Sequence, residues 1–398
     1  MTFSSFSLFA FTSSLLALLS DKNTNAYWTT IFNTNKKPLV VPRVSAGPID
    51  ISAIGCGTWS WGNRLLYNYD TSQDEEIYRA YQLLRDSGVT LFDTADSYGT
   101  LDLNGRAEIL LGNFERRYIQ QNPTKFITRN NTNKSILQQQ QVATKFAPYP
   151  WRVFPSSMVH AAKDSLRRLQ QDRLTIAQLH WSTAKYQPFQ EQALWEGIAQ
   201  VYESGLCDAV GVSNYGPVQL RKIHQFFSER QPSSLSSSAT RPSNKVPLAT
   251  VQIQYSLMTY KDSMTQDITS TCDDLNIRLI SYSPLCLGLL TNKYTLDNLP
   301  PTGNPRRQLF RELLPEAKPL LMTLKAMGDE LGKSSSMVAI NWAITKGTVP
   351  IFGARTASQV EDNLASIGWT LSKDRMDALD KEALKLKKPM IQNIFQTK

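Results

Sequence analysis

Short apolar runs alternate with longer amphipathic segments over most of this chain. Strands buried on both faces of a parallel sheet are apolar almost throughout, whereas helices on a protein surface show apolar residues every three or four positions. The alternation repeats eight times. The predicted strands cover residues 51–57, 90–95, 142–146, 175–181, 208–214, 250–256, 278–284 and 348–353.

Predicted helices separate these strands. Residues 74–88, 156–170 and 192–205 have apolar positions at helical spacing, and Gly88 and Gly205 stand where two of these helices should end, as glycine commonly does. Eight strands with intervening helices predict an α/β fold. We expect a single-domain (β/α)8 TIM barrel rather than an open, doubly wound sheet.

Three features interrupt the regular repeat. Residues 122–141 are rich in Asn and Gln, and residues 229–246 are rich in Ser and Pro. Both have the composition of disordered segments and precede the third and sixth strands, so we interpret them as solvated insertions on the face opposite the strand carboxyl ends. Two helical segments, 316–332 and 334–347, lie between the seventh and eighth strands, so one of them is an addition.

The first 47 residues differ in composition from the rest. Residues 3–19 are apolar but shorter than a membrane-spanning helix of about 20 residues. They also lack the preceding basic residue of a secretory signal. An acid-poor, polar stretch follows, and this order resembles the two-part presequences of plastids bounded by extra membranes. We therefore expect a disordered targeting presequence over 1–47, a barrel over 48–398, and a plastid or chloroplast location, with the secretory pathway as the alternative.

Composition and charge limit the classes of partner. The chain has 398 residues, of which 41% are hydrophobic and 19% charged, as in soluble globular proteins. Its net charge of +9 is spread among interspersed acids and bases, so we expect no nucleic-acid partner, although a basic balance suits an anionic cofactor. We also expect a monomer without a membrane span in the mature chain. The cysteines show neither paired nor metal-ligand spacing, which predicts free thiols and no metal site; they are Cys56, Cys207, Cys272 and Cys286.

Four ionisable residues stand at the carboxyl ends of predicted strands, where TIM barrels carry their active sites. Asp93 and Tyr98 follow the second strand, Lys145 closes the third and His180 closes the fourth. Reduction of a carbonyl by hydride leaves negative charge on oxygen, which must receive a proton. A phenol can supply that proton, and a neighbouring ammonium should lower the pKa of Tyr98 and so favour proton donation.

The other members of the group have complementary roles. Asp93 would keep the buried Lys145 charged, and His180 would orient the substrate oxygen. Each residue alone has an ordinary structural interpretation: a helix cap, a packing phenol, a surface charge or a core histidine. Only their order and placement together indicate chemistry.

These motifs resemble the aldo/keto reductase superfamily over residues ~48–390. The similarity is carried by FDTADSYG (92–99), GRAEILLG (105–112), VATKF, QLHWS, VGVSNYG, SYSPLCLGLLTNKY (281–294) and PIFGARTASQVEDN (350–363), and it is strongest to a chloroplast branch of uncharacterised NADP-dependent reductases. The resemblance implies that Asp93, Tyr98, Lys145 and His180 are the catalytic tetrad, with Tyr98 as proton donor and NADP(H) as cofactor.

The same resemblance indicates which residues hold the cofactor. Short polar groups would bind the nicotinamide carboxamide, an aromatic ring would stack on the nicotinamide, the loop after the seventh strand would follow the pyrophosphate, and residues after the eighth strand would bind the adenosine end. Among the last group, a guanidinium suits the 2′-phosphate, with Lys293 or Arg221 as alternatives. The expected residues are Ser213, Asn214, Gln252, Tyr282, Ser283, Pro284, Leu285, Gly288, Leu290, Gly353, Arg355, Gln359 and Asn363.

Three functions remain open at this point. The first is NADPH-dependent reduction of a small-molecule aldehyde or ketone to an alcohol. The second is the narrower activity of a pyridoxal reductase. The third is a binding or redox-sensing subunit, as in potassium-channel β subunits, which keep the barrel and the tetrad. An aromatic mouth built from Trp59, Trp61, Trp151 and Trp181 would suit flat or apolar carbonyls.

Overall fold

A computed structural model describes residues 41–126, 139–230, 245–388, 390 and 395–397. The predicted presequence, apart from its last residues, and the central parts of both predicted insertions lie outside the described residues. The folded unit includes the described residues from Val41 onward.

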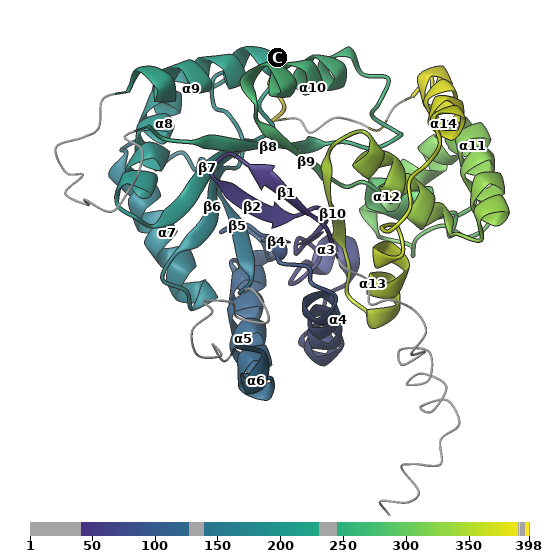
Figure 1. Ribbon diagram of the computed structural model, residues 1–398, viewed down its shortest axis with the longest axis horizontal. Coiled ribbons are helices and arrows are strands. Elements are labelled where there is room, and N and C mark those ends of the chain that lie inside the picture. Colours follow the sequence, from purple (N-terminus) through teal and green to yellow (C-terminus); the bar gives the residue numbers. More distant parts are fainter. Residues whose placement is uncertain (1–40, 127–138, 231–244, 389, 391–394, 398) are drawn as a thin grey trace, which may run out of the picture. The chain divides into compact units, whose positions relative to one another are not determined.

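Eight parallel strands close into a barrel, and the eighth strand pairs with the first (Figure 1). This confirms the predicted (β/α)8 fold, and all eight predicted strands are present. In barrel order they are β3 (Gly55–Gly57), β4 (Leu91–Asp93), β5 (Gln141–Phe146), β6 (Leu174–Leu179), β7 (Cys207–Ser213), β8 (Leu248–Gln254), β9 (Arg278–Tyr282) and β10 (Val349–Gly353).

An antiparallel hairpin that the sequence did not reveal lies against the barrel (Figure 1). It consists of β1 (Arg43–Ala46) and β2 (Ile49–Ser52), so the first predicted strand, 51–57, is in fact the end of β2 followed by β3. Arg43 donates hydrogen bonds to Thr90 and Gln141. The barrel unit therefore includes residues that the sequence assigned to the presequence, and its amino-terminal boundary lies before Pro48.

The interior of the barrel is built in layers, because alternate residues of each strand point inward. The hairpin residues Ala46 and Ile51 pack on an apolar layer that closes one end. The strand residues of this layer are Leu91, Ala143, Ile176, Ile280, Val349 and Ile351. Two residues further along β4, β5 and β6 stand Asp93, Lys145 and Gln178, so a polar layer follows directly on the apolar one.

Helices surround the barrel (Figure 1). Ser87 caps α4 and is followed by Gly88 at φ 84°, and Gly205, after α8, has φ 77°, so both predicted glycine stops are confirmed. The α-helices are α3 (Arg64–Tyr67), α4 (Asp74–Asp86), α5 (Arg106–Gln121), α6 (Pro123–Phe126), α7 (Ser156–Leu169), α8 (Pro188–Glu203), α9 (Pro217–Glu229), α10 (Ser263–Leu275), α11 (Pro305–Leu331), α12 (Ser335–Thr345), α13 (Ala357–Leu364) and α14 (Lys373–Lys385). Short 3-10 turns are η1 (Thr71–Gln73), η2 (Leu101–Leu103) and η3 (Cys286–Thr291).

Helix α11 begins well before the predicted start at residue 316. Asn304 caps it by accepting a hydrogen bond from the Arg306 backbone N–H, and Pro305 occupies the first helical turn, where the missing N–H costs nothing. The prediction failed because Pro315 and Pro319 lie inside the helix, and interior prolines normally indicate a break. Packing of α11 against α12 and α14 overrides that local signal.

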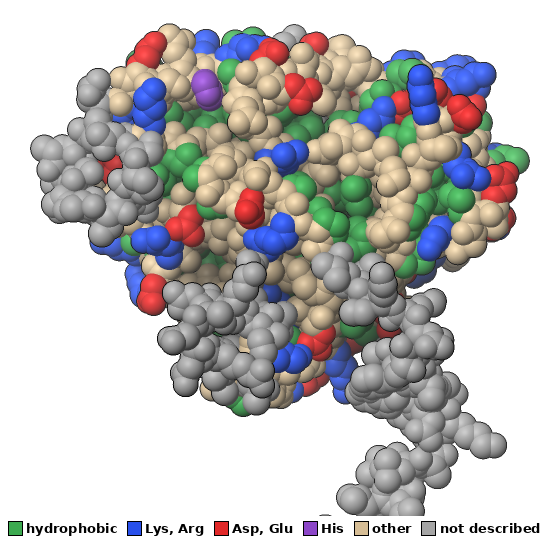
Figure 2. Space-filling model, viewed as in Figure 1, with side chains coloured by type: hydrophobic (Ala, Val, Ile, Leu, Met, Phe, Trp, Pro, Cys, Tyr) green, Lys and Arg blue, Asp and Glu red, His purple; other side chains and the backbone are tan. Residues whose placement is uncertain are grey.

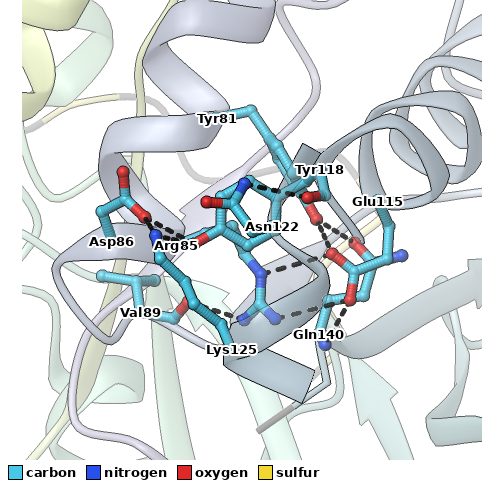
Figure 3. A network of polar contacts seen from close by, with 9 residues as sticks. All are labelled: Tyr81, Arg85, Asp86, Val89, Glu115, Tyr118, Asn122, Lys125 and Gln140. Carbon is cyan, nitrogen blue, oxygen red and sulfur yellow. Dashed lines mark hydrogen bonds and ion pairs between the residues drawn. The ribbon is translucent and has the colours of Figure 1, made fainter. Parts of the chain in front are cut away.

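A buried ion pair joins α4 to α5 near the first insertion (Figure 3). The Arg85 guanidinium, fully buried, lies 3.3 Å from the Glu115 carboxylate. Glu115 also accepts hydrogen bonds from the Tyr81 hydroxyl and from the backbone N–H of Gln140, which directly precedes β5. At the other end of the insertion, Lys125 of α6 pairs with Asp86. These contacts fix both described ends of the inserted segment to the same two helices.

The surface and the thiols agree with the composition. Acidic and basic side chains are interspersed over the face seen in Figure 2. All four cysteines are free and buried. Among the described residues, no helix is long and apolar enough to span a membrane, and no cluster of His, Cys, Asp and Glu has the composition of a metal site.

Candidate active site

One cavity of about 800 Å³ contains all four tetrad residues. Asp93 ends β4, Lys145 lies near the end of β5, and His180 directly follows β6, so the parallel strands bring them to one rim. Tyr98 lies on the loop between β4 and α5. Its backbone N–H bonds to the carbonyl of Ala95, and its own carbonyl accepts from the N–H of Ala107. The predicted convergence of the four residues is therefore present in the structure.

Asp93 and Lys145 form a buried ion pair at the base of the cavity. The Lys145 ammonium donates to Asp93 Oδ1 at 2.5 Å and to the carbonyl of Thr94 at 2.8 Å, and the two side chains are only 3% and 1% exposed. Burial lowers the pKa of Lys145, while the charge of Asp93 opposes that fall. The backbone carbonyl of Asp93 also accepts a hydrogen bond from the hydroxyl of Thr58, which ties the end of β4 to the residue after β3.

Tyr98 and His180 face one another across the cavity. Their rings meet edge to face with centroids 5.7 Å apart, and the Lys145 ammonium lies 4.9 Å from the Tyr98 ring centroid. Burial, followed by the charge of Lys145, lowers the pKa of His180 well below its usual value. The imidazole is therefore neutral at physiological pH and can act as a hydrogen-bond partner, but not as a cation.

The expected effect of Lys145 on Tyr98 is not found in this site. Burial raises the pKa of Tyr98 well above its usual value, and the negative charge of Asp93 adds to the rise. The expectation of a lowered pKa counted only the ammonium, whereas desolvation of the phenolate and the paired carboxylate both oppose ionisation. Tyr98 accordingly keeps its proton at neutral pH, which leaves it available for donation.

Polar residues at the ends of β7, β8 and β9 form one wall beside the tetrad. The Tyr282 hydroxyl donates to Asn214 Oδ1 at 2.9 Å, and Asn214 Nδ2 donates to the carbonyl of His180 at 3.0 Å. Asn214 takes a left-handed conformation, φ 59°, as it leaves β7, which asparagine tolerates better than most residues. Together with Ser213 and Gln252, these residues line the cavity as predicted.

The loop after β9 follows the cavity wall, as the sequence indicated. Ser283, Pro284, Leu285 and Gly288 all line the cavity. Leu290 does not: its side chain is fully buried in the hydrophobic core, and its backbone N–H bonds to the carbonyl of Leu285 to close η3. Sequence similarity alone cannot separate a residue that faces the cavity from one that anchors the same loop.

Two arginines line the cavity beside Tyr67. Arg355, after β10, donates to the backbone carbonyl of Tyr67, and Arg306, at the start of α11, donates to that of Leu287. Both guanidinium groups lie near the Tyr67 ring, at 5.6 and 5.1 Å from its centroid. Burial and then the charge of Arg306 lower the pKa of Arg355. Neither arginine forms an ion pair within the described part of the chain.

The remaining residues predicted to contact the cofactor also divide into those that line the cavity and those that do not. Gly353, Gln359 and Asn363 line the cavity, as does the alternative cation Lys293. Gln359 Oε1 accepts from the Arg355 backbone N–H, so it also shapes the turn. Arg221 does not reach the cavity, because it pairs with Asp274 between α9 and α10.

The aromatic mouth differs from the prediction. Trp59 and Trp181 line the cavity, and Trp181 stacks on Phe395 with ring centroids 4.3 Å apart. Trp61 is fully buried in the core, and Trp151 is 70% exposed and outside the cavity lining. Reasoning from sequence missed Tyr67, Arg306 and Phe395, because they reach the cavity through tertiary packing from distant segments and carry no local signal.

Comparison with known proteins agrees with this geometry. The profile of the aldo/keto reductase family matches residues 53–383. The chain is 48% identical to the chloroplastic pyridoxal reductase of Arabidopsis thaliana, over 93% of this chain and 94% of that protein. It is 30% identical to an uncharacterised oxidoreductase of Mycobacterium bovis, over 83% of this chain and 88% of that protein.

Solved structures show the same fold. A glycerol dehydrogenase from Gluconobacter oxydans superposes with a TM-score of 0.66 at 21% identity, covering 89% of this chain and 98% of that one. An aldo-keto reductase crystallised with NADPH gives a TM-score of 0.58 at 21% identity, covering 86% of this chain and 88% of that one.

Proposed function

The chain belongs to the aldo/keto reductase family, and from this premise we propose that it reduces an aldehyde or ketone to an alcohol with NADPH, Tyr98 being the proton donor. The observation that carries the proposal is the buried Asp93–Lys145 pair beneath a Tyr98 that keeps its proton, with a neutral His180 facing it.

The residues present fit a phosphorylated nicotinamide cofactor. Bound NADPH would supply the hydride. Ser213, Asn214 and Gln252 offer donors and acceptors for a carboxamide, and the Tyr282 ring gives an aromatic face beside them. The guanidinium groups of Arg355 and Arg306, which have no carboxylate partner in the described part of the chain, suit an anion such as the 2′-phosphate.

The tetrad handles the proton. His180, neutral and half-buried, can orient a carbonyl oxygen toward the Tyr98 hydroxyl, and Tyr98 then donates its proton to the alkoxide as charge develops. The Lys145 ammonium next to the Tyr98 ring stabilises the phenolate left behind. Asp93 holds that ammonium in place.

We propose pyridoxal as the first substrate to test. The proposal rests on the pyridoxal reductase relative at 48% identity. The aromatic lining, which includes Trp59 and a Trp181 stacked on Phe395, suits a flat heteroaromatic aldehyde. We also propose that residues preceding the folded unit direct the chain to the plastid, in keeping with the chloroplastic name of that relative.

Purified full-length protein tests the substrate. NADPH oxidation should be measured with pyridoxal, simple aliphatic aldehydes and ketones, and the alcohol product should be identified. Activity with pyridoxal is the expected result. Activity with other carbonyls alone would reject pyridoxal and keep the reductase, whereas NADPH retained with every carbonyl would reject the reductase.

A further inference from the structure

A buried glutamine, Gln178, contacts the Asp93 carboxylate. Gln178 lies on β6, opposite Lys145 in the β5–β6 register, and its side chain is fully buried. Its Nε2 donates to Asp93 Oδ2 at 3.3 Å, and Gln252 Nε2 donates to the same oxygen at 2.7 Å. Asp93 Oδ1 accepts from Lys145. The carboxylate is thus surrounded by donors from three other strands.

The barrel interior is shaped to accommodate this glutamine. Gly211 on β7 is opposite Gln178 in the register. A Cβ at Gly211 would lie 3.1 Å from Gln178 Cγ and 2.2 Å from Thr250 Oγ1, which is too close for any side chain. The missing side chain at 211 therefore leaves the volume in which Gln178 reaches Asp93.

The amide donors fix the orientation of the Asp93 carboxylate. An amide nitrogen can only donate, and a buried carboxylate without donors is costly. Two amide donors and one ammonium therefore hold the Asp93 carboxylate in a single orientation. The Gln178 Oε1 atom is buried and has no hydrogen-bond partner among the described residues. One acceptor of this side chain is therefore unsatisfied while its Nε2 donates to Asp93.

We propose that Gln178 is a positioning residue for the reaction, holding the Asp93 carboxylate aimed at Lys145 while Gln252 serves the nicotinamide wall. Gln252 contacts Asp93 and also lines the cavity beside Asn214. Gln178 is absent from the cavity lining, so its bond to Asp93 persists whatever the cavity holds. This inference rests on the proposed reductase function.

Gln178→Met tests the loss of the donor at similar volume. We expect kcat to fall by about tenfold, the change that corresponds to about 1.4 kcal/mol, with the KM for the carbonyl unchanged. Gln140→Met is the matched control. Gln140 is also a buried glutamine with one unpartnered atom, but it lies before β5 beside Tyr81 and Glu115, so its loss should reduce stability and leave kcat unchanged.

Gln178→Glu supplies a signature that a packing role would not produce. A carboxyl at this position can donate to Asp93 only while it is protonated, and two facing carboxyl groups hold one proton more tightly than either alone. Its kcat should therefore approach the wild-type value at acid pH and fall as the pH rises toward neutral, a range over which the wild-type kcat stays level. Gln140→Glu places the same change near Glu115 and should leave the pH dependence of kcat unaltered.

Thermal unfolding gives a readout that needs no substrate. The native state of Gln178→Glu should bind more protons than its unfolded state above pH ~4.3, so its stability deficit relative to wild type should grow as the pH rises from there. A deficit that is constant with pH, or a normal kcat in Gln178→Met, would overturn the proposal for Gln178. Wild-type protein that reduces no carbonyl would instead overturn the reductase function, and the unfolding measurement would still decide whether Gln178 serves Asp93.

Discussion

At the scale of single residues, the chemistry of the site depends on which side chains are charged in their buried surroundings. Tyr98 keeps its proton and His180 is neutral, because burial disfavours the charged form of each. Lys145 keeps a counter-charge in Asp93. The proposed division of labour between a proton donor, a neutral orienting group and a fixed cation follows from these three environments.

The proton donor is tested by Tyr98→Phe. We expect kcat for carbonyl reduction to fall by ~100-fold or more, the usual contribution of a general acid, while NADPH affinity stays the same. Tyr255→Phe is the control. Its ring is buried against Trp342, outside the cavity lining, so its turnover should match that of wild type. Near-normal turnover in Tyr98→Phe would remove this residue from the mechanism.

The pH profile tests the charge assignments. Because the pKa of His180 is lowered, no inflection is expected near its usual value of about 6.5, and kcat should be level through neutral pH. Because burial lowers the pKa of Lys145, its ammonium should lose a proton as the pH rises, before the usual value of about 10.4 is reached, and kcat should decline there. An inflection near pH 6.5 that disappears in His180→Gln would contradict this assignment.

Arg355 tests cofactor selectivity. Arg355 lines the cavity, and a hydrogen bond to a charged group contributes ~1.5–3 kcal/mol. Arg355→Ala should weaken NADPH binding by that amount and leave NADH binding almost unchanged, as measured by fluorescence titration. Arg221→Ala, which breaks an ion pair outside the cavity, should change neither. Equal losses for both cofactors would mean that Arg355 only supports the loop through Tyr67.

At the scale of elements, the hairpin and the α4–α5 pair are the features that strand and helix periodicity did not reveal. The hairpin closes the apolar end of the barrel, so removing β1 exposes Ile51 and the layer beneath it. A chain starting at Pro48 should be less stable than one starting at Val41 by roughly 2 kcal/mol or more, about one buried aliphatic side chain. Equal urea midpoints for the two chains would show that β1 is dispensable.

The ion pair of Figure 3 makes a second prediction at this scale. Arg85→Met leaves the Glu115 carboxylate buried without its cation and should cost about 3–5 kcal/mol in urea unfolding. Adding Glu115→Leu removes the stranded charge and should recover part of that loss. If the double variant were as unstable as the sum of the single ones, the two residues would not act as a pair.

At the scale of the whole molecule, the order of strands and the meeting of Asp93, Lys145 and His180 could be predicted from the sequence, because each lies at or next to the end of an apolar run that has only one place in a barrel. Gln178 carried the same signal, two residues before His180 on an inward position, and was overlooked as part of an apolar strand. Arg306, Tyr67 and Phe395 could not be predicted, because α3, the start of α11 and the carboxyl-terminal residues meet the cavity only through packing.

The incorrect sequence predictions have the same physical origin. The hairpin and β3 are separated by only Ala53 and Ile54, so the pattern read them as one strand. The prolines of α11 suggested a helix start that packing overrides. Leu290 and Trp61 belong to motifs that contact the cavity, yet both side chains point into the core. Local pattern therefore placed the strands, whereas tertiary packing decided which side chains face the cavity.

Single-turnover reaction of the NADPH complex with pyridoxal tests the central claim most directly. Rapid mixing should oxidise the bound nicotinamide with one equivalent of alcohol formed, and Tyr98→Phe should slow that step by ~100-fold or more at unchanged NADPH occupancy. Bound NADPH that stays reduced with pyridoxal and with every other carbonyl, in a protein that holds the cofactor tightly, would contradict the account and identify a cofactor-binding subunit instead of an enzyme.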